Sequence, residues 1–92
     1  MTFGYYFNCT VDNLHQSLIN LTFGYHFNKS VDNLPQSLKN LTFGIKFNQS
    51  VDNLPNLLII INFIDDFYYN FNKELNCLPN SISEISLPRN YN

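Results

Sequence analysis

The side chains that could do chemistry are few, and their spacing matches no known type of reaction centre. His15 and His26 lie 11 residues apart, and no set of Cys, His, Asp or Glu recurs with the spacing of metal ligands. The sequence contains no nucleophile paired with a base, no phosphate-binding loop and no nucleotide motif. We therefore predict a protein that is not an enzyme and that binds neither a metal nor a cofactor.

One acidic side chain does recur at a regular interval. Asp12, Asp32 and Asp52 are 20 residues apart, so they form a column if the segments between them stack. Neighbouring strands lie about 4.8 Å apart, and buried carboxylates at that spacing would repel one another. We therefore expect the three carboxylates to be exposed to solvent at a turn. The alternative is that the column binds cations.

The best candidates for binding are side chains that vary at a fixed place in a repeated frame. The frame is Thr-Phe-Gly-x-x-Phe-Asn-x-x-Val-Asp-Asn-Leu, and it occurs at residues 2–14, 22–34 and 42–54. Its first variable pair changes in each copy, and Tyr is a common anchor at interfaces. We predict a partner-binding surface made of this pair and the threonine row: Tyr5, Tyr6, Tyr25, His26, Lys46, Thr22 and Thr42. The alternative is drift at tolerant positions, or partial filling of the core by Tyr5, Tyr25 and Ile45.

The elements that position these residues follow from the period. A unit of 20 residues cannot enclose a core, so the copies must stack as a solenoid. Alternation from Leu41 to Phe43 predicts a short strand with one buried face, and residues 57–63 are predicted to form the strand of the next copy. Positions that stay apolar in each full copy predict the inward face, which in the second copy is Leu21, Phe23, Phe27, Val31, Leu34 and Leu38.

Two polar or small positions of the frame predict how the copies contact one another. The glycine repeated after each strand indicates either a turn with positive φ or a close approach of neighbouring coils. The asparagine of each Phe-Asn pair is predicted to bond turn backbone of its own or the next coil. This buried ladder, which we favour over a ligand-binding role, consists of Asn8, Asn28, Asn48 and Asn72.

We divide the chain into one solenoid over residues 1–92, with full copies at residues 1–20, 21–40 and 41–60. A degenerate fourth copy, residues 61–84, contains four extra residues somewhere within residues 64–70, and a truncated fifth copy occupies residues 85–92. Inserted loops in solenoids often lie on the binding face, so the acidic and aromatic residues 65–69 are a second candidate surface. A degenerate strand is the alternative at that place.

Leu-Thr-Phe-Gly followed by Phe-Asn and Leu-Pro resembles the FNIP repeat, a relative of the leucine-rich repeat found in social-amoeba and giant-virus proteins. The resemblance implies a leucine-rich-repeat-like solenoid with one short parallel β-strand per repeat and with turns or 3-10 segments on the convex side. It also implies protein–protein interaction. Many members of the family carry an F-box ahead of the repeats and act as substrate adaptors of ubiquitin ligases.

The bulk properties restrict the class of partner. The net charge is −2, whereas a general nucleic-acid binder would show a basic face, so we expect no binding to nucleic acid. No secretory signal and no apolar stretch of membrane-spanning length occur, so we expect no membrane association and an intracellular, cytoplasmic location. Cys9 and Cys77 are three repeats apart, roughly 14 Å in a stack of strands, which is too far for a disulfide.

The sequence leaves three functions open. The first is a module that binds an unknown protein partner on a concave repeat surface. The second is a structural solenoid that forms a homo-oligomer by end-to-end stacking, because the first copy starts with an apolar strand and the fifth is truncated. The third is a remnant of a longer repeat protein, of the F-box and FNIP adaptor type, without independent activity.

Overall fold

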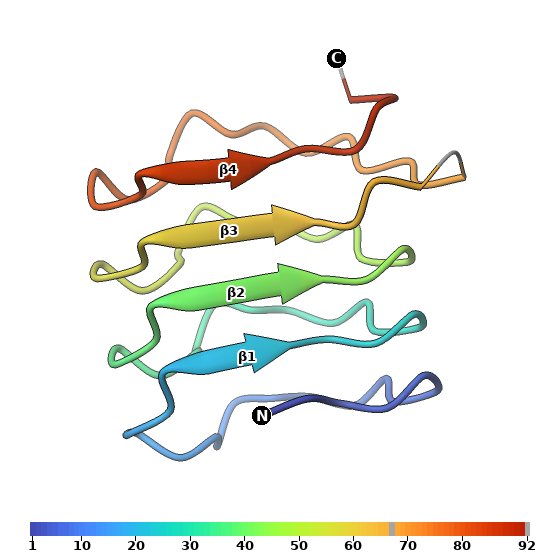
Figure 1. Ribbon diagram of the computed structural model, residues 1–92. Helices are drawn as coiled ribbons and strands as arrows, with labels where there is room; N and C mark the ends of the chain where they lie inside the picture. The colour runs from blue at the N-terminus through green and yellow to red at the C-terminus, as the bar shows by residue number, and fades with distance from the viewer. Residues whose placement is uncertain (67, 92) are drawn as a thin grey trace.

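The computed structural model describes residues 1–66 and 68–91, and it is a stack of coils joined by a parallel sheet (Figure 1). Phe67 of the second candidate surface and Asn92 lie outside the described residues. Each strand is followed by a return path of turns, and no part of the described chain forms a helix that could cross a membrane. The predicted leucine-rich-repeat-like solenoid is confirmed. Its strands, in sheet order, are β1 (Asn20–Thr22), β2 (Asn40–Phe43), β3 (Ile60–Phe63) and β4 (Glu84–Ser86).

The strand register follows the repeat. Leu21 pairs with Leu41, Leu41 with Ile61, and Ile61 with Ile85. The partners of the first coils are 20 residues apart, as for Asn20 and Asn40. From Asn72 onward the offset to the preceding coil is 24 residues. The additional residues therefore lie between Phe63, the last residue paired at the shorter offset, and Asn72.

Two details of the predicted strands are wrong. β3 does not begin at residue 57 but at Ile60, because Leu58 N–H donates to the Pro55 carbonyl at 3.3 Å and closes a turn just before it. The first copy contributes no full strand, only an isolated bridge between Thr2 and Thr22.

The core is a pair of phenylalanine columns with aliphatic side chains around them. Within one coil, the rings of Phe23 and Phe27 stack with centroids 3.8 Å apart, and Phe43 stacks on Phe47 at the same distance. Between coils, the rings of Phe27 and Phe47 are nearly parallel, and their centroids are 6.1 Å apart. All six inward positions predicted from the second copy are buried, which confirms that face.

The repeated glycine is explained by close approach and not by a special turn. None of the three glycines has positive φ. A Cβ placed on Gly24 would lie 2.2 Å from the carbonyl oxygen of Gly4, and one on Gly44 would lie 2.2 Å from the oxygen of Gly24. A side chain there would collide with backbone, so glycine sets how closely the coils stack.

An ion pair ties the last described turn to the fourth coil. Arg89 Nε lies 3.1 Å from Asp65 Oδ1, and the backbone N–H of Arg89 donates to the same oxygen at 3.0 Å. These hydrogen bonds from Arg89 lower the pKa of the Asp65 carboxyl below its ordinary value. Because the folded-state pKa is depressed, the pair favours the folded chain above the ordinary carboxyl pKa, and its contribution is lost as the pH falls through the lowered value.

We therefore expect Arg89→Gln to move the titration of Asp65 upward, toward the ordinary pKa of a carboxyl group. Carboxyl carbon shifts followed by NMR during an acid titration of the wild-type chain and of the variant measure this. An Asp65 titration that stays unchanged in the variant would show that the ion pair does not form in solution.

Candidate interaction surface

The variable pairs lie at the corners of tight turns, where the strands end. Phe27 N–H donates to the Gly24 carbonyl at 3.4 Å and Phe47 N–H to the Gly44 carbonyl at 3.3 Å, which closes a four-residue turn around each pair. In Figure 1 these turns project beyond the arrowheads of the strands. Tyr6 is 80% exposed and Tyr5 54%. The variable side chains thus occupy an edge of the stack.

The structure brings the predicted stripe residues into contact with one another. Tyr5 stacks on Tyr25 with ring centroids 4.9 Å apart, and Tyr6 stacks on His26 at 5.1 Å. Lys46 Nζ lies 5.9 Å from the centroid of the Tyr25 ring, within the range of a cation–π contact. We name these five residues the corner stripe. Ile45, at the same place as Tyr25 one coil later, is half-buried against the core.

The threonine row lies elsewhere. Thr22 and Thr42 are partners in the sheet and alternate with the buried residues that flank them, so their side chains are on the outer face of the sheet. On the same face Asn40 Nδ2 donates to Asn20 Oδ1 at 2.5 Å, a second amide contact between coils that the sequence analysis missed. The sheet face and the corner stripe are therefore two adjacent surfaces.

The Phe-Asn asparagines bond from coil to coil. Asn8 Oδ1 accepts from Asn28 N–H at 2.8 Å, Asn28 Oδ1 from Asn48 N–H at 2.8 Å, and Asn48 Oδ1 from Asn72 N–H at 3.2 Å. The prediction that this ladder is buried is wrong, since Asn8 and Asn72 are exposed and the other two are half-buried. The ladder runs along the outside of the phenylalanine columns, beside the corner turns, where solvent reaches its nitrogen atoms.

The fourth coil places its own side chains at this edge. Tyr69 N–H donates to the Asp66 carbonyl at 3.1 Å, so Tyr69 closes the turn that a phenylalanine closes in the earlier coils. Tyr68 precedes it and is 80% exposed, while Tyr69 is 1% exposed. Tyr68 is therefore the fourth-coil equivalent of Tyr6, His26 and Lys46. The sequence did not reveal the position of Tyr68, because the fourth copy is aligned with the others by its Phe71-Asn72 pair. In the earlier coils the phenylalanine of this pair closes the corner turn, whereas in the fourth coil the turn closes two residues before it.

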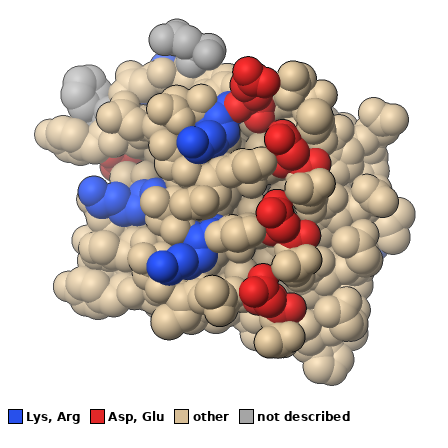
Figure 2. Space-filling model, turned by 180° about the vertical axis from the view of Figure 1, so that it is seen from behind, with Lys and Arg blue, Asp and Glu red and all other residues tan. Residues whose placement is uncertain are grey.

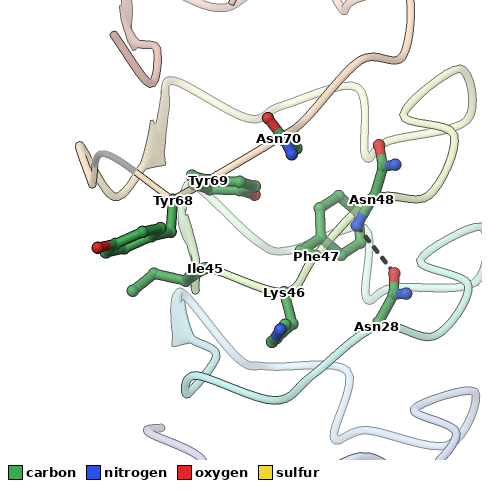
Figure 3. Close-up of a pocket in the computed structure, with 8 residues that line it drawn as sticks. All are labelled: Asn28, Ile45, Lys46, Phe47, Asn48, Tyr68, Tyr69 and Asn70. Atoms are coloured by element: carbon green, nitrogen blue, oxygen red, sulfur yellow. Dashed lines mark hydrogen bonds between the residues drawn. The ribbon is translucent and has the colours of Figure 1, made fainter. Parts of the chain in front are cut away.

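The insertion also interrupts the contact between the third and fourth coils. In the earlier coils each corner turn bonds the one before it: His26 N–H donates to the Tyr5 carbonyl and Lys46 N–H to the Tyr25 carbonyl, both at 3.0 Å. Within residues 1–66 and 68–91, no N–H donates to the corresponding carbonyl of Ile45. A cavity of about 290 Å³ opens there (Figure 3). It is lined by Asn28, Ile45, Lys46, Phe47, Asn48, Tyr68, Tyr69 and Asn70.

A buried hydroxyl group belongs to this cavity. The Tyr69 hydroxyl makes no hydrogen bond with any described residue, and in Figure 3 it points toward the middle of the lining residues. Burial raises the pKa of the Tyr69 phenol above its ordinary value, so the group stays protonated and can donate. A buried polar group without a hydrogen-bond partner destabilises the fold.

The aspartate column lies at turns of the return path, exposed to solvent as expected. Asn33 Nδ2 donates to Asp12 Oδ1 at 3.3 Å, and Asn53 Nδ2 donates to Asp32 Oδ1 at 3.4 Å. Figure 2 shows acidic side chains following one another along this side of the stack. Within the described residues, no three His, Cys, Asp or Glu side chains are grouped in a way that could hold a metal ion. The column therefore serves as a set of amide-to-carboxylate contacts between turns.

Comparison with known proteins identifies the repeat. Residues 9–46 match the model of the FNIP Repeat. This part of the chain carries the FNIP repeat. A solved structure from a giant virus, the crystal structure of CroV588, described as a novel circular LRR protein, superposes on the chain with a TM-score of 0.84. The two are 41% identical, and the match covers 99% of this chain and 14% of that one. No curated protein matches.

The chain spans about one seventh of CroV588, since the match covers 14% of that protein. The same superposition supports the leucine-rich-repeat type of the fold, with four parallel strands in the described chain and turns between them. The circular form is a property of the solved protein.

Proposed function

We propose that this FNIP-repeat chain is a non-enzymatic interaction module that binds a protein partner along the corner stripe, with Tyr68 as its fourth-coil continuation. The observation that supports the proposal most is the stacking of highly exposed aromatic rings. Tyr6, although 80% exposed, stacks on His26, and Tyr5 stacks on Tyr25. Rings that are already held by their neighbours lose little conformational freedom when a partner covers them, which favours binding.

The repeat frame also supports this assignment. Leucine-rich-repeat-like solenoids offer extended surfaces to partners, and here the invariant positions account for stacking of the coils. Phe, Gly and Asn of the frame fill the core, allow backbone contact and bond the coils. In the corner pairs, His26 Nδ1 hydrogen-bonds the Tyr5 carbonyl oxygen at 3.0 Å and Ile45 is half-buried, whereas Tyr5, Tyr6 and Lys46 are exposed. Exposed side chains are free to differ from coil to coil, as the surface of a specific binder requires.

The test compares two double variants of the purified chain. Tyr6→Ala combined with His26→Ala should weaken binding to a partner captured from native cell extract by at least about tenfold. Asn13→Ala combined with Asn33→Ala alters exposed residues of the return path, and partner binding should be unchanged. Circular dichroism should show that both variants remain folded. Equal affinity of the two variants for every captured protein would exclude the corner stripe as the binding surface.

Self-association is the alternative that the same samples decide. Light scattering over a concentration series should report a constant mass if the stripe binds another protein. A mass that grows with concentration, and that the Tyr6 and His26 substitutions leave unchanged, would instead support the end-to-end stacking of solenoids and the role of a structural element.

A further inference from the structure

The cavity next to Lys46 offers hydrogen-bond donors and a positive charge. The oxygen atoms of Asn28 and Asn48 are occupied by the ladder, Asn28 Oδ1 accepting from both Asn48 N–H and Gln49 Nε2. This arrangement fixes which end of each amide is free, because the acceptor must be the oxygen. Each of these two lining residues therefore has an NH₂ group left to donate. The ammonium group of Lys46 lies against the Tyr25 ring in this structure, and its flexible side chain can turn toward the cavity.

The Tyr69 hydroxyl is a fourth donor beneath the cavity lining, where a ligand reaches it once the lining side chains move aside. Its phenol is buried, protonated and without a partner among the described residues. Supplying an acceptor to such a group recovers the free energy that its burial costs. A ligand with two acceptor oxygens and a negative charge fits this set of donors, and a carboxylate is the group in proteins with those properties.

The backbone at the same place favours a peptide over a free acid. The carbonyl of Ile45 is the one corner carbonyl among the first three coils that receives no N–H from the coil above within the described chain. A partner's backbone N–H can replace the missing donor, as in the addition of an extended segment to an existing ladder. The cavity, at about 290 Å³, is smaller than a drug-sized pocket and is suited to one side chain.

We propose that this cavity binds the side-chain carboxylate of an Asp or Glu residue in an extended segment of the protein partner, between Lys46 and the Tyr69 hydroxyl. The inference deepens the proposed function, since it assumes a protein partner. The neighbouring acids do not compete for these donors: Asp65 is paired with Arg89, and an oxygen of Asp66 accepts from Tyr68 N–H at 2.8 Å. Neither acid lines the cavity.

The test is an NMR titration of the labelled chain with N-acetyl-glutamate N-methylamide, using the glutamine analogue as the neutral control. The glutamate probe should shift the amide signals of Lys46, Asn48 and Tyr69, and the glutamine probe should bind at least about tenfold more weakly. Acetate, which lacks the backbone N–H, should also bind more weakly than the glutamate probe. Equal shifts with the glutamine probe, no shift with either probe, or acetate binding as tightly as the glutamate probe would overturn the proposal.

Variants separate binding from folding. Lys46→Gln should weaken the glutamate probe about tenfold, whereas Lys29→Gln, which alters an exposed lysine outside the cavity, should not. Tyr69→Phe should also weaken the probe and yet raise the melting temperature, because it removes an unpaired buried hydroxyl group. A purely structural Tyr69 would leave probe binding unchanged, and that result would contradict its role in the site.

The failure of this inference can be told apart from failure of the proposed function. The Tyr6→Ala and His26→Ala double variant should keep its affinity for the glutamate probe, because neither residue lines the cavity. If the probe does not bind but this variant still loses the partner, the carboxylate site is wrong and the corner stripe stands. If the probe binds and the variant keeps the partner, the stripe is wrong and the carboxylate site stands.

Discussion

Gly24→Ala is expected to destabilise the folded chain by at least about 3 kcal/mol, at the upper end of the cost of overpacking. The added Cβ would lie 2.2 Å from the carbonyl oxygen and 2.7 Å from the carbonyl carbon of Gly4. Both atoms are backbone, so the two coils must separate. The inter-coil bond between His26 N–H and the Tyr5 carbonyl lies within the turn that Gly24 begins, so this separation weakens it. Urea unfolding followed by circular dichroism measures the loss.

Gly4→Ala is the matched control for this substitution. A Cβ on Gly4 meets nothing within 4 Å, and its φ is not positive. Alanine there is expected to be neutral or to stabilise by up to about 1 kcal/mol, because it reduces the freedom of the unfolded chain. Similar losses in the two variants would mean that glycine is required for the turn itself and that the close packing of coils is not its reason.

Asn28→Ala is expected to cost about 2 to 3 kcal/mol of unfolding free energy, the range for leaving a half-buried donor unpaired. Its oxygen accepts from Asn48 N–H at 2.8 Å and from Gln49 Nε2 at 3.1 Å. The substitution leaves the backbone N–H of Asn48 without an acceptor, and this N–H cannot turn toward water unless the coil opens. Unfolding by urea gives the size of the loss, and hydrogen exchange should show Asn48 N–H as the amide most affected.

Asn33→Ala provides the comparison within the same coil. Asn33 is exposed, and its amide donates to an exposed aspartate at 3.3 Å, so its loss should change stability by less than about 0.5 kcal/mol. Equal costs for the two asparagines would contradict a structural ladder at the Phe-Asn position.

The fold follows from the sequence wherever the frame repeats without interruption. Phe23 and Phe27 could be assigned to the core because they persist in each full copy, and burial in a stack needs only that pattern. For the repeated glycine, the sequence leaves two possible roles and cannot decide between them. A turn with positive φ and a close approach leave the same residue in the sequence, and only the position of the Gly4 carbonyl against Gly24 distinguishes them.

The candidate surface was predictable for the residues of the first three copies and not for those of the fourth. Tyr6 and His26 stand at equal offsets from the glycine, so their alignment follows from the period. Tyr68 and Tyr69 follow an insertion whose place in the coil the sequence does not determine. Their roles depend on one hydrogen bond, from Tyr69 N–H to the Asp66 carbonyl, which makes one tyrosine a corner residue and buries the other.

Photo-cross-linking from two positions tests most directly the claim that partners bind the corner stripe. A benzophenone amino acid placed at Tyr6, on the stripe, should give an adduct with a protein partner that unlabelled wild-type chain competes away and the Tyr6→Ala and His26→Ala variant does not. The same amino acid at Asn13, exposed on the return path, should give none. An adduct from Asn13 with the same partner, and none from Tyr6, would place the binding surface on the opposite side and contradict the account.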